Sequence, residues 1–306
     1  MASTQEVNVS ITGGTFNSNV YLGALTDTAI TSGASLKATV TGGKISGLYG
    51  GGLAQRGGTA NAGAVTISVS GGEIDAIIGG GSHVNKEETT ANTTTVDSVA
   101  INVSGGTIGS IYAGGHYNDT LAGYFGSDTV SGDAVLTLSG DAEVGKAAGS
   151  WRGIDTVGGQ RKLVFDDYTG TCKTVCDWDL VTFDGENATT ADLSSATVYG
   201  VGAWSFDVIG REANAGTALV DIGDWFGSKT TIDLHITDAA TSLTTWSLAE
   251  FDGSLGDLTF NVYDAASTEL ASGLALEDTI TTGTFTNYGF SVDDATNTLQ
   301  FGLLSA

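Results

Sequence analysis

Hydrophobic and polar residues alternate strictly at the start of five related segments. At residues 65–70 the apolar residues Val65, Ile67 and Val69 alternate with Thr66, Ser68 and Ser70, and Val99, Ile101 and Val103 take the matching places in the clearest copy, residues 99–115. A period of two predicts a β-strand with one face in a core and the other in solvent. The other four copies begin at residues 7, 36, 65 and 134. We therefore expect each segment to form a strand of a repeated unit.

A glycine corner and a second apolar position follow each alternating run. Glycine permits a sharp turn with positive φ. The corners begin at Gly13, Gly42, Gly71, Gly105 and Gly140, the last of which is followed by Asp141 instead of a second glycine. Beyond the corners, an apolar residue recurs at the matching place: Phe16, Ile45, Ile74, Ile108 and Val144. We expect these five side chains to form one internal stack.

The spacing of the corners predicts the architecture. Successive corners are 29, 29, 34 and 35 residues apart, and the extra residues fall in the segments 81–97 and 116–133. One unit cannot bury its own apolar face, so stacked units must share a core. The pattern predicts an all-β fold, a right-handed parallel β-helix with a rise of about 4.8 Å per coil. The runner-up is a β-prism or a sandwich, but a sandwich predicts turns about every 8–12 residues.

The periodicity divides the chain into two expected domains. Residues 1–160 are the repeat array of five coils, and the segment RKLVFDDY at 161–168 interrupts it. Residues 161–306 still contain short alternating strands, which predicts a less regular β-helix continuation. The segment 288–304 is expected to form a terminal hairpin that caps the open core.

Four tryptophans recur in the second half of the chain. They are Trp178, Trp204, Trp225 and Trp246, and the last three are evenly spaced. We interpret them as core aromatics of the less regular coils. Sugar stacking is the alternative interpretation.

Composition narrows the classes of partner. The 306 residues include 46 Gly, no Pro, and 11 Lys+Arg against 35 Asp+Glu, for a net charge of −24. A polyanion would be repelled by this charge, which argues against DNA, RNA and anionic membranes as ligands.

No apolar run reaches the length of a membrane span, and no signal peptide opens the chain. The opening, MASTQEVNV, enters a repeat already under way, so we expect the natural protein to be longer at its N-terminus.

The two cysteines, Cys172 and Cys176, lie close together in the sequence CKTVC. A disulfide across so short a loop would contribute little by loop closure. A metal site needs more ligands, and no histidine lies nearby. Redox motifs usually have two intervening residues, whereas this pair has three. We interpret the pair as a small structural disulfide formed in an oxidising compartment.

The acidic residues beside the corners are the candidates for enzymatic chemistry. A polysaccharide lyase needs a base and calcium-binding carboxylates on one face, and a glycoside hydrolase needs two carboxylates roughly 5–9 Å apart. Glu73, Asp75 and Glu143 are the candidates. No cluster of lysine or arginine accompanies them. The register also makes Lys44 a neighbour of Glu73 on the outer face, either as an exposed ion pair or as two unrelated charges.

Two histidines stand where loops leave the second glycine cluster. His83 and His116 occupy this place in successive repeats, where they could bind a metal or simply pack at the root of each loop. A groove beside these loops is where we expect a ligand to bind. Its candidate residues are His116, Tyr117 and Asp119. We expect no catalytic residues, no metal site and no cofactor.

The repeat units resemble those of a known group of proteins. The units VxVSGGxIxxIYxGG, the segment RKLVFDDYTGT and the tryptophan-bearing tail are similar to passenger regions of bacterial autotransporter-like surface proteins. The resemblance implies a secreted right-handed β-helix, often an adhesin, with an outer-membrane barrel C-terminal to it, which this sequence lacks. The family has no fixed functional residues, so none can be carried over.

We therefore expect a non-enzymatic structural and adhesive module, located outside the cell or on a bacterial cell surface. Its variable loops would meet glycans or host or cell-surface proteins, and the chain itself would not be embedded in a membrane. The alternative is a carbohydrate-active β-helix enzyme, a polysaccharide lyase or a glycoside hydrolase. A cleft with converging carboxylates and aromatics would favour the enzyme, and a smooth rod covered by Thr, Ser and Asn would favour the adhesin.

Overall fold

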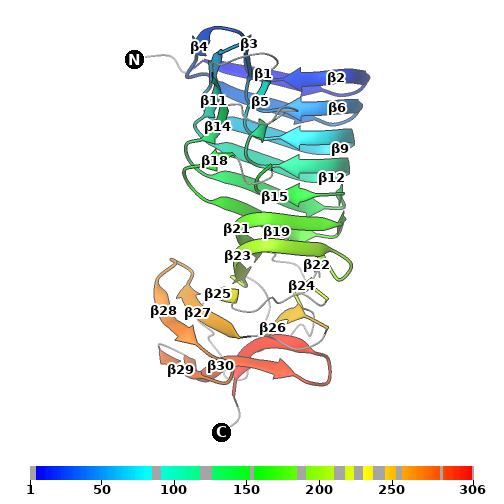
Figure 1. The fold of residues 1–306 in the computed structure, drawn as a ribbon. Coiled ribbons are helices and arrows are strands. Elements are labelled where there is room, and N and C mark those ends of the chain that lie inside the picture. The colour runs from blue at the N-terminus through cyan, green and yellow to red at the C-terminus, as the bar shows by residue number, and fades with distance from the viewer. Residues whose placement is uncertain are drawn as a thin grey trace.

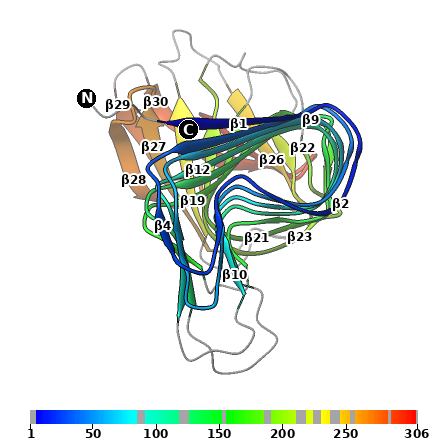
Figure 2. The same cartoon turned by 90° about the horizontal axis from the view of Figure 1, so that it is seen from above.

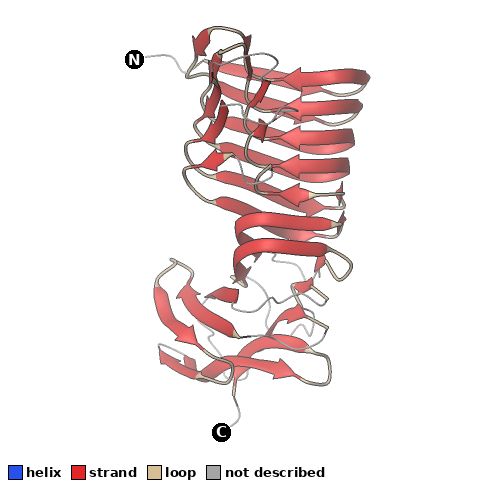
Figure 3. Cartoon of the chain, in the orientation of Figure 1, coloured by secondary structure: helices blue, strands red, loops and turns tan. Residues whose placement is uncertain are grey.

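The structure is a computed structural model, and it describes most of the chain. The described residues are 5–84, 91–117, 126–151, 155–184, 191–209, 218–223, 230–236, 245–252, 257–282 and 285–304. Within them the secondary structure is β-strand without any helix, so the expected all-β class is confirmed (Figure 3). The strands form a tall stack with the two termini at opposite ends (Figure 1).

The largest sheet, sheet A, has sixteen strands among the described residues. Its path is β1 (Glu6–Ile11), β5 (Ser35–Val40), β9 (Val65–Ile78), β12 (Val99–Tyr112), β15 (Ala134–Gly140), β19 (Arg161–Tyr168), β21 (Thr174–Asp184), β23 (Thr197–Asp207), β25 (Thr230–Ile236), β27 (Leu258–Asp264) and β28 (Glu269–Leu274). Alongside this path run β2 (Thr15–Tyr21), β6 (Lys44–Tyr49), β16 (Glu143–Val144), β17 (Ala147–Ala148) and β20 (Thr171–Cys172).

Three smaller sheets complete the stack. Sheet B contains β3 (Leu25–Thr26), β7 (Leu53–Gln55), β10 (Ser82–Val84) and β13 (His116–Tyr117). Sheet C contains β4 (Ala29–Thr31), β8 (Thr59–Asn61), β11 (Asn92–Val96), β14 (Gly126–Val130) and β18 (Thr156–Val157). Sheet D contains β22 (Ala191–Asp192), β24 (Val220–Asp221), β26 (Thr245–Glu250), β29 (Thr279–Thr282), β30 (Phe285–Asp293) and β31 (Thr298–Leu303).

Successive repeats pair in parallel and in register through sheet A. One column of paired residues runs through Val9, Ala38, Ile67, Ile101, Leu136, Leu163, Val181, Trp204, Ile232 and Phe260. All of them except Val9 are buried. Because neighbouring parallel strands lie about 4.8 Å apart, this alignment makes a continuous core of the apolar positions that alternate in the sequence.

The expected internal stack beyond the glycine corners is present. Pairing joins Phe16, Ile45, Ile74, Ile108 and Val144 in this order, and then continues to Cys172. The four inner members of the expected set are buried. Phe16 keeps its place in the register but is 38% exposed, because the described chain places no further strand over β2.

The corners use positive φ, as the glycines predict. The second glycine of each pair has φ near +90°, as at Gly43 (98°) and Gly72 (100°). In the fifth repeat, where Asp141 replaces that glycine, Gly140 itself takes φ 57°. In β19 the corresponding irregularity falls at Asp167, with φ 45°. Asp is one of the few non-glycine residues that adopt this conformation readily, so the corner survives the loss of glycine.

Strand pairing crosses the boundary expected at residue 160. The segment 161–168 interrupts the sequence period, but it forms β19, which pairs with β15 through Leu136 and Leu163. Parallel pairing in sheet A then continues to β27, and only β28 is antiparallel. The C-terminal half therefore extends the same sheet with less regular sequence.

The far end of the stack is covered by antiparallel strands. The expected terminal hairpin is present as β30 and β31, and β31 also pairs with β26. Phe290 and Phe301 from this hairpin are completely buried. Trp178, Trp204 and Trp246 are buried core aromatics, as expected, whereas Trp225 lies outside the described residues.

Candidate functional site

Sheets B and C pack face to face and form a narrow arm beside sheet A. Figure 2, a view along the stack, shows the strands β4 and β10 of this arm running away from sheet A. The segments that vary in length between repeats connect β10 to β11 and β13 to β14 in the sequence. The interior of the arm is unusual because several inward positions carry polar side chains beside aliphatic ones such as Val96 and Val130.

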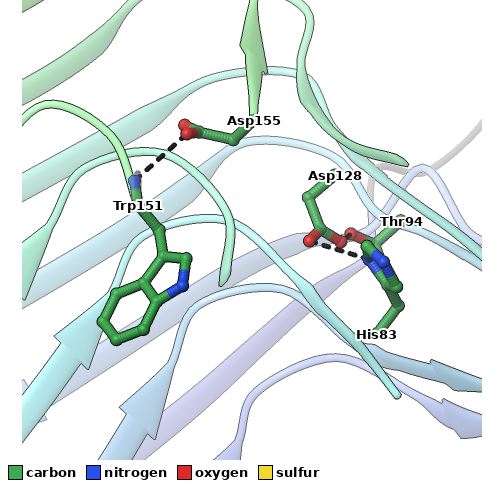
Figure 4. A network of polar contacts seen from close by, with 5 residues as sticks. All are labelled: His83, Thr94, Asp128, Trp151 and Asp155. Carbon is green, nitrogen blue, oxygen red and sulfur yellow. Dashed lines mark hydrogen bonds and ion pairs between the residues drawn. The ribbon is translucent and has the colours of Figure 1, made fainter. Parts of the chain in front are cut away.

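Three buried polar residues meet inside the arm (Figure 4). His83 lies on β10, and its Nδ1 is 2.9 Å from Oδ2 of Asp128 on β14. Thr94 on β11 donates its hydroxyl to Oδ1 of the same carboxyl group. All three side chains are buried. Burial raises the pKa of Asp128, and the hydrogen bonds from His83 and Thr94 oppose this rise.

Glycines on the facing strands make room for this network. A Cβ atom at Gly126 would lie 2.2 Å from Nε2 of His83. A Cβ atom at Gly115 would lie 2.2 Å from Cβ of Asp128, and one at Gly81 would lie 2.4 Å from Oγ1 of Thr94. The polar side chains therefore fill space that a larger residue on the opposite strand would occupy.

The order of the hydrogen bonds distinguishes this network from a catalytic triad. In a triad the histidine lies between the carboxylate and the hydroxyl nucleophile and accepts the hydroxyl proton. Here the carboxylate lies in the middle, because Asp128 accepts from both His83 and Thr94. The hydroxyl of Thr94 is thus bound to an acceptor that holds it in place and is not aimed at an imidazole base. The arrangement is suited to joining the strands of the arm.

A second buried carboxyl group lies one repeat further along the arm. Asp155 immediately precedes β18, and the pairing of Thr129 with Thr156 makes it the neighbour of Asp128 in sheet C. Its Oδ1 accepts a 3.1 Å hydrogen bond from the backbone N–H of Trp151, and its Oδ2 has no hydrogen-bond partner among the described residues. Burial raises the pKa of Asp155, partly opposed by Ser150 and by the charge of Arg161. Asp155 therefore binds a proton more readily in the folded state than in the unfolded chain.

This raised pKa gives a pH prediction for the Asp155→Asn variant. A carboxyl group whose folded pKa is raised contributes stability that is fully present below its unfolded pKa, about 3.9, and is lost as the pH rises through the folded pKa. At pH 7 the variant should therefore be more stable than the natural protein. The advantage should shrink as the pH falls toward about 4. Urea unfolding at a series of pH values measures it.

Asp133 provides a control of opposite sign. The backbone N–H of Gln160 and the ammonium group of Lys162 lower its pKa, so its stabilisation is present at neutral pH and is lost as the pH falls through the folded pKa. Asp133→Asn should therefore destabilise the protein at pH 7. The chain has a net charge of −24, so general charge repulsion also makes the free energy of unfolding depend on pH. This contribution is nearly the same in the variants and in the natural protein, so it cancels in the comparison. An advantage of Asp155→Asn that grew on acidification would contradict the assignment.

His116 belongs to an aromatic cluster at the root of the arm, made of Tyr49, Tyr112, His116 and Trp151. The ring of Trp151 lies 4.3 Å from that of His116 and 4.5 Å from that of Tyr112, measured between centroids. Tyr49 meets His116 edge-on at 5.9 Å. Tyr49 and Tyr112 are buried, while His116 and Trp151 are half-buried. The cluster packs the outside of sheet A against the arm.

The proposed ligand residues are only partly within the described structure. His116 and Tyr117 form β13, but nothing is described of the side chain of Tyr117, and Asp119 lies outside the described residues. His83 and His116 do not face each other. Ser82 pairs with His116 and His83 pairs with Tyr117, so the two histidines are offset by one residue and point to opposite faces. No group of three metal-ligating side chains occurs in the described ranges.

The expected disulfide between Cys172 and Cys176 is not formed, and both residues are buried free thiols. The reason is their register. Cys172 continues the internal stack after Val144, whereas Cys176 follows Ala148 in a column that belongs to a second apolar cluster with Tyr112. Burial raises the pKa of Cys172 to about 12 and also raises that of Cys176. Both thiols therefore remain protonated and unreactive at neutral pH.

The candidate carboxylates of the outer face, Glu73, Asp75 and Glu143, are exposed and share no cavity. Lys44 and Glu73 form an ion pair, which decides between the two alternatives left open by the sequence, and both side chains are half exposed. In the same column Glu143 accepts a 3.2 Å hydrogen bond from Thr107, which separates it from Glu73. A shallow cavity of about 200 Å³ lies here, and Glu143 is the one carboxylate that lines it, beside Thr107, Thr171 and Lys173. One exposed carboxylate cannot supply the two roles of a glycosidase pair.

Sequence reasoning named His83 but missed its partners Thr94 and Asp128, although a signal for them was present. Val96 and Val130 are buried, and a strand alternates its faces, so residues two positions away share their orientation. This places Thr94 and Asp128 in the interior. Both residues lie near the ends of the variable segments 81–97 and 116–133, in strands too short to show a period by themselves. Comparison of the chain with protein-family models, with curated proteins and with solved structures gives no match.

Proposed function

We propose that this chain is a right-handed parallel β-helix that serves as a non-enzymatic structural and adhesive module. The observation that carries the proposal is the regular polar outer face of sheet A. Thr39, Ser68, Asn102 and Thr137 form an outward column in neighbouring repeats, opposite the buried column of the core. Such a surface offers hydrogen-bonding groups at a constant spacing, whereas catalysis needs groups that converge in a partly desolvated pocket.

The described residues support the module over an enzyme. The outer carboxylates are exposed and share no cavity, and the buried carboxyl groups of the arm accept hydrogen bonds from neighbouring residues. None of the described residues forms a helix long and apolar enough to cross a membrane. The proposed location is the bacterial cell surface or the extracellular space, on the resemblance of the repeats to autotransporter-like passengers. The proposed ligands are glycans or host or cell-surface proteins that meet the loops of the arm.

A binding array tests the proposal. Immobilised glycans and matrix proteins are probed with the natural chain and with the double variant His116→Ala/Asp119→Ala. We expect binding to at least one class of ligand, and we expect the double variant to weaken it. His235→Ala is the matched control, because His235 is also half-buried but stacks on Tyr263 in the C-terminal half. The control should bind normally.

An activity panel tests the alternative. Pectins, xylans, glucans and mucin glycans are incubated with the chain and assayed for reducing ends and unsaturated products. We expect no turnover. Turnover that Glu143→Gln abolishes would overturn the proposal in favour of an enzyme. A complete lack of binding on the array would overturn the adhesive role.

A further inference from the structure

We propose, on the basis of the adhesive role proposed for this chain, that the shallow cavity beside Glu143 binds one ring of a neutral glycan. The cavity measures about 200 Å³ and spans three successive repeats. It lies in the regular part of the stack, on the side of sheet A that follows the glycine corners, and is therefore separate from the arm. Its lining includes Thr107, Gly109, Glu143, Gly145, Thr171 and Lys173.

Two glycines keep the floor of the cavity free of side chains. Gly109 and Gly145 stand two positions after Thr107 and Glu143, which pair in register. An added Cβ atom at Gly145 would lie 2.4 Å from the carbonyl oxygen of Gly109, and one at Gly109 would lie 2.4 Å from that of Asp75. Each repeat thus approaches the previous one too closely to admit a side chain here. The cavity lies over these two positions.

Two residues of opposite charge line the cavity and form no ion pair with each other among the described ion pairs. They are Glu143 and Lys173, and both are exposed. Glu143 pairs with Thr171, and Lys173 follows on the same face, after the buried Cys172. The Cα atoms of Glu143 and Lys173 are therefore about 8 Å apart, from a strand separation of about 4.8 Å and a rise of about 3.3 Å per residue.

The hydroxyl groups of a sugar match this pair of charges. A hydroxyl donates a hydrogen bond to a carboxylate and accepts one from an ammonium group, so one neutral ring can bind both Glu143 and Lys173. Thr107 donates a 3.2 Å hydrogen bond to Oε2 of Glu143, which orients the carboxylate, and Thr171 adds a hydroxyl group. The cavity is smaller than the roughly 300–1,000 Å³ of sites for drug-sized ligands, which suits a single ring.

The charge of the chain favours a neutral glycan over an anionic one. Glu143 would repel the carboxylate of a uronic acid, and the net charge of −24 adds repulsion at longer range. The cavity contains a single carboxylate, whereas cleavage of a glycosidic bond needs two. We therefore expect binding at this place without turnover.

Titration with neutral tetrasaccharides of glucose, mannose, galactose or xylose tests the site, with the amide chemical shifts of the chain as the measurement. We expect at least one tetrasaccharide to bind and to shift the amide signals of Gly109 and Gly145. Lys173→Met and Glu143→Ala should each raise its dissociation constant by about tenfold or more, since each removes a hydrogen bond to a charged group. A tetrasaccharide of galacturonic acid should bind more weakly.

Lys44→Met and Glu73→Ala are the matched controls. Both residues are exposed on the same wall in earlier repeats and do not line the cavity, so these variants should bind normally. Neutral glycan binding that is indifferent to Lys173→Met and Glu143→Ala would overturn this site but not the adhesive role. A chain that binds proteins or anionic glycans, but no neutral tetrasaccharide, would overturn the ligand class alone. Only a complete lack of binding, on the array as well, would overturn both.

Discussion

Replacing Ile101 with alanine is expected to lower the free energy of unfolding by about 2–5 kcal/mol, the usual cost of truncating a buried aliphatic side chain. Ile101 is completely buried on β12, between Ile67 and Leu136 of the neighbouring repeats. The cavity would lie in the middle of the column, where the backbone of two adjacent strands limits collapse. Urea denaturation followed by circular dichroism measures the change.

The adjacent residue provides the control for this prediction. Asn102 is exposed on the outer face of the same strand, so Asn102→Ala should change the free energy of unfolding by about 0.5 kcal/mol or less. The two variants test which face of β12 lies inside. Equal losses for Ile101→Ala and Asn102→Ala would mean that the alternation does not separate core from solvent.

Replacing Gly79 with alanine is expected to cost about 1–3 kcal/mol or more, as overpacking of a tight site usually does. An added Cβ atom would lie 2.3 Å from the carbonyl oxygen of Ala113 and 2.4 Å from Cγ1 of Val99. The first of these atoms belongs to the backbone of the next repeat, so relief requires the repeats to move apart. Gly79 does not have positive φ, so the cost would come from contact alone.

Gly13 is the matched control for Gly79. It too lacks positive φ, and an added Cβ atom would meet nothing within 4 Å. Gly13→Ala should be neutral, or should stabilise the protein by about 0.4–1 kcal/mol by reducing the freedom of the unfolded chain. Thermal or urea unfolding of the two variants should separate them clearly. Comparable losses at both positions would show that the contact between repeats is looser than the structure indicates.

The repeat pattern predicts sheet A closely because the same kinds of contact recur in each repeat. Alternation identified the inward face of each strand, and the glycine pair identified the corner. The equivalent positions after the corners predicted the column of paired residues from Ile45 to Val144. The ion pair between Lys44 and Glu73 follows from the same register. These features depend on contacts between equivalent positions of neighbouring repeats, which the sequence period reveals directly.

The arm was harder to predict because its strands are short and their spacing varies. A strand of two to five residues gives too few alternations to show a period. Some inward positions of the arm are polar, against the usual association of apolar residues with burial, so Thr94 and Asp128 look like loop residues. The predicted disulfide between Cys172 and Cys176 was wrong for another reason. Proximity in sequence suggested a bond, but the two residues belong to different columns of the register.

The arrangement of the hydrogen bonds has a mechanical consequence. Bonds between parallel strands point from one repeat to the next, along the direction that joins the two termini in Figure 1. A force applied to those termini would load the repeats in series and peel strands away one at a time, instead of shearing many bonds together. Each released repeat of 29 residues would lengthen the chain by about 100 Å. The molecule would therefore act as an extensible tether that yields in steps, beginning with its least stable repeat.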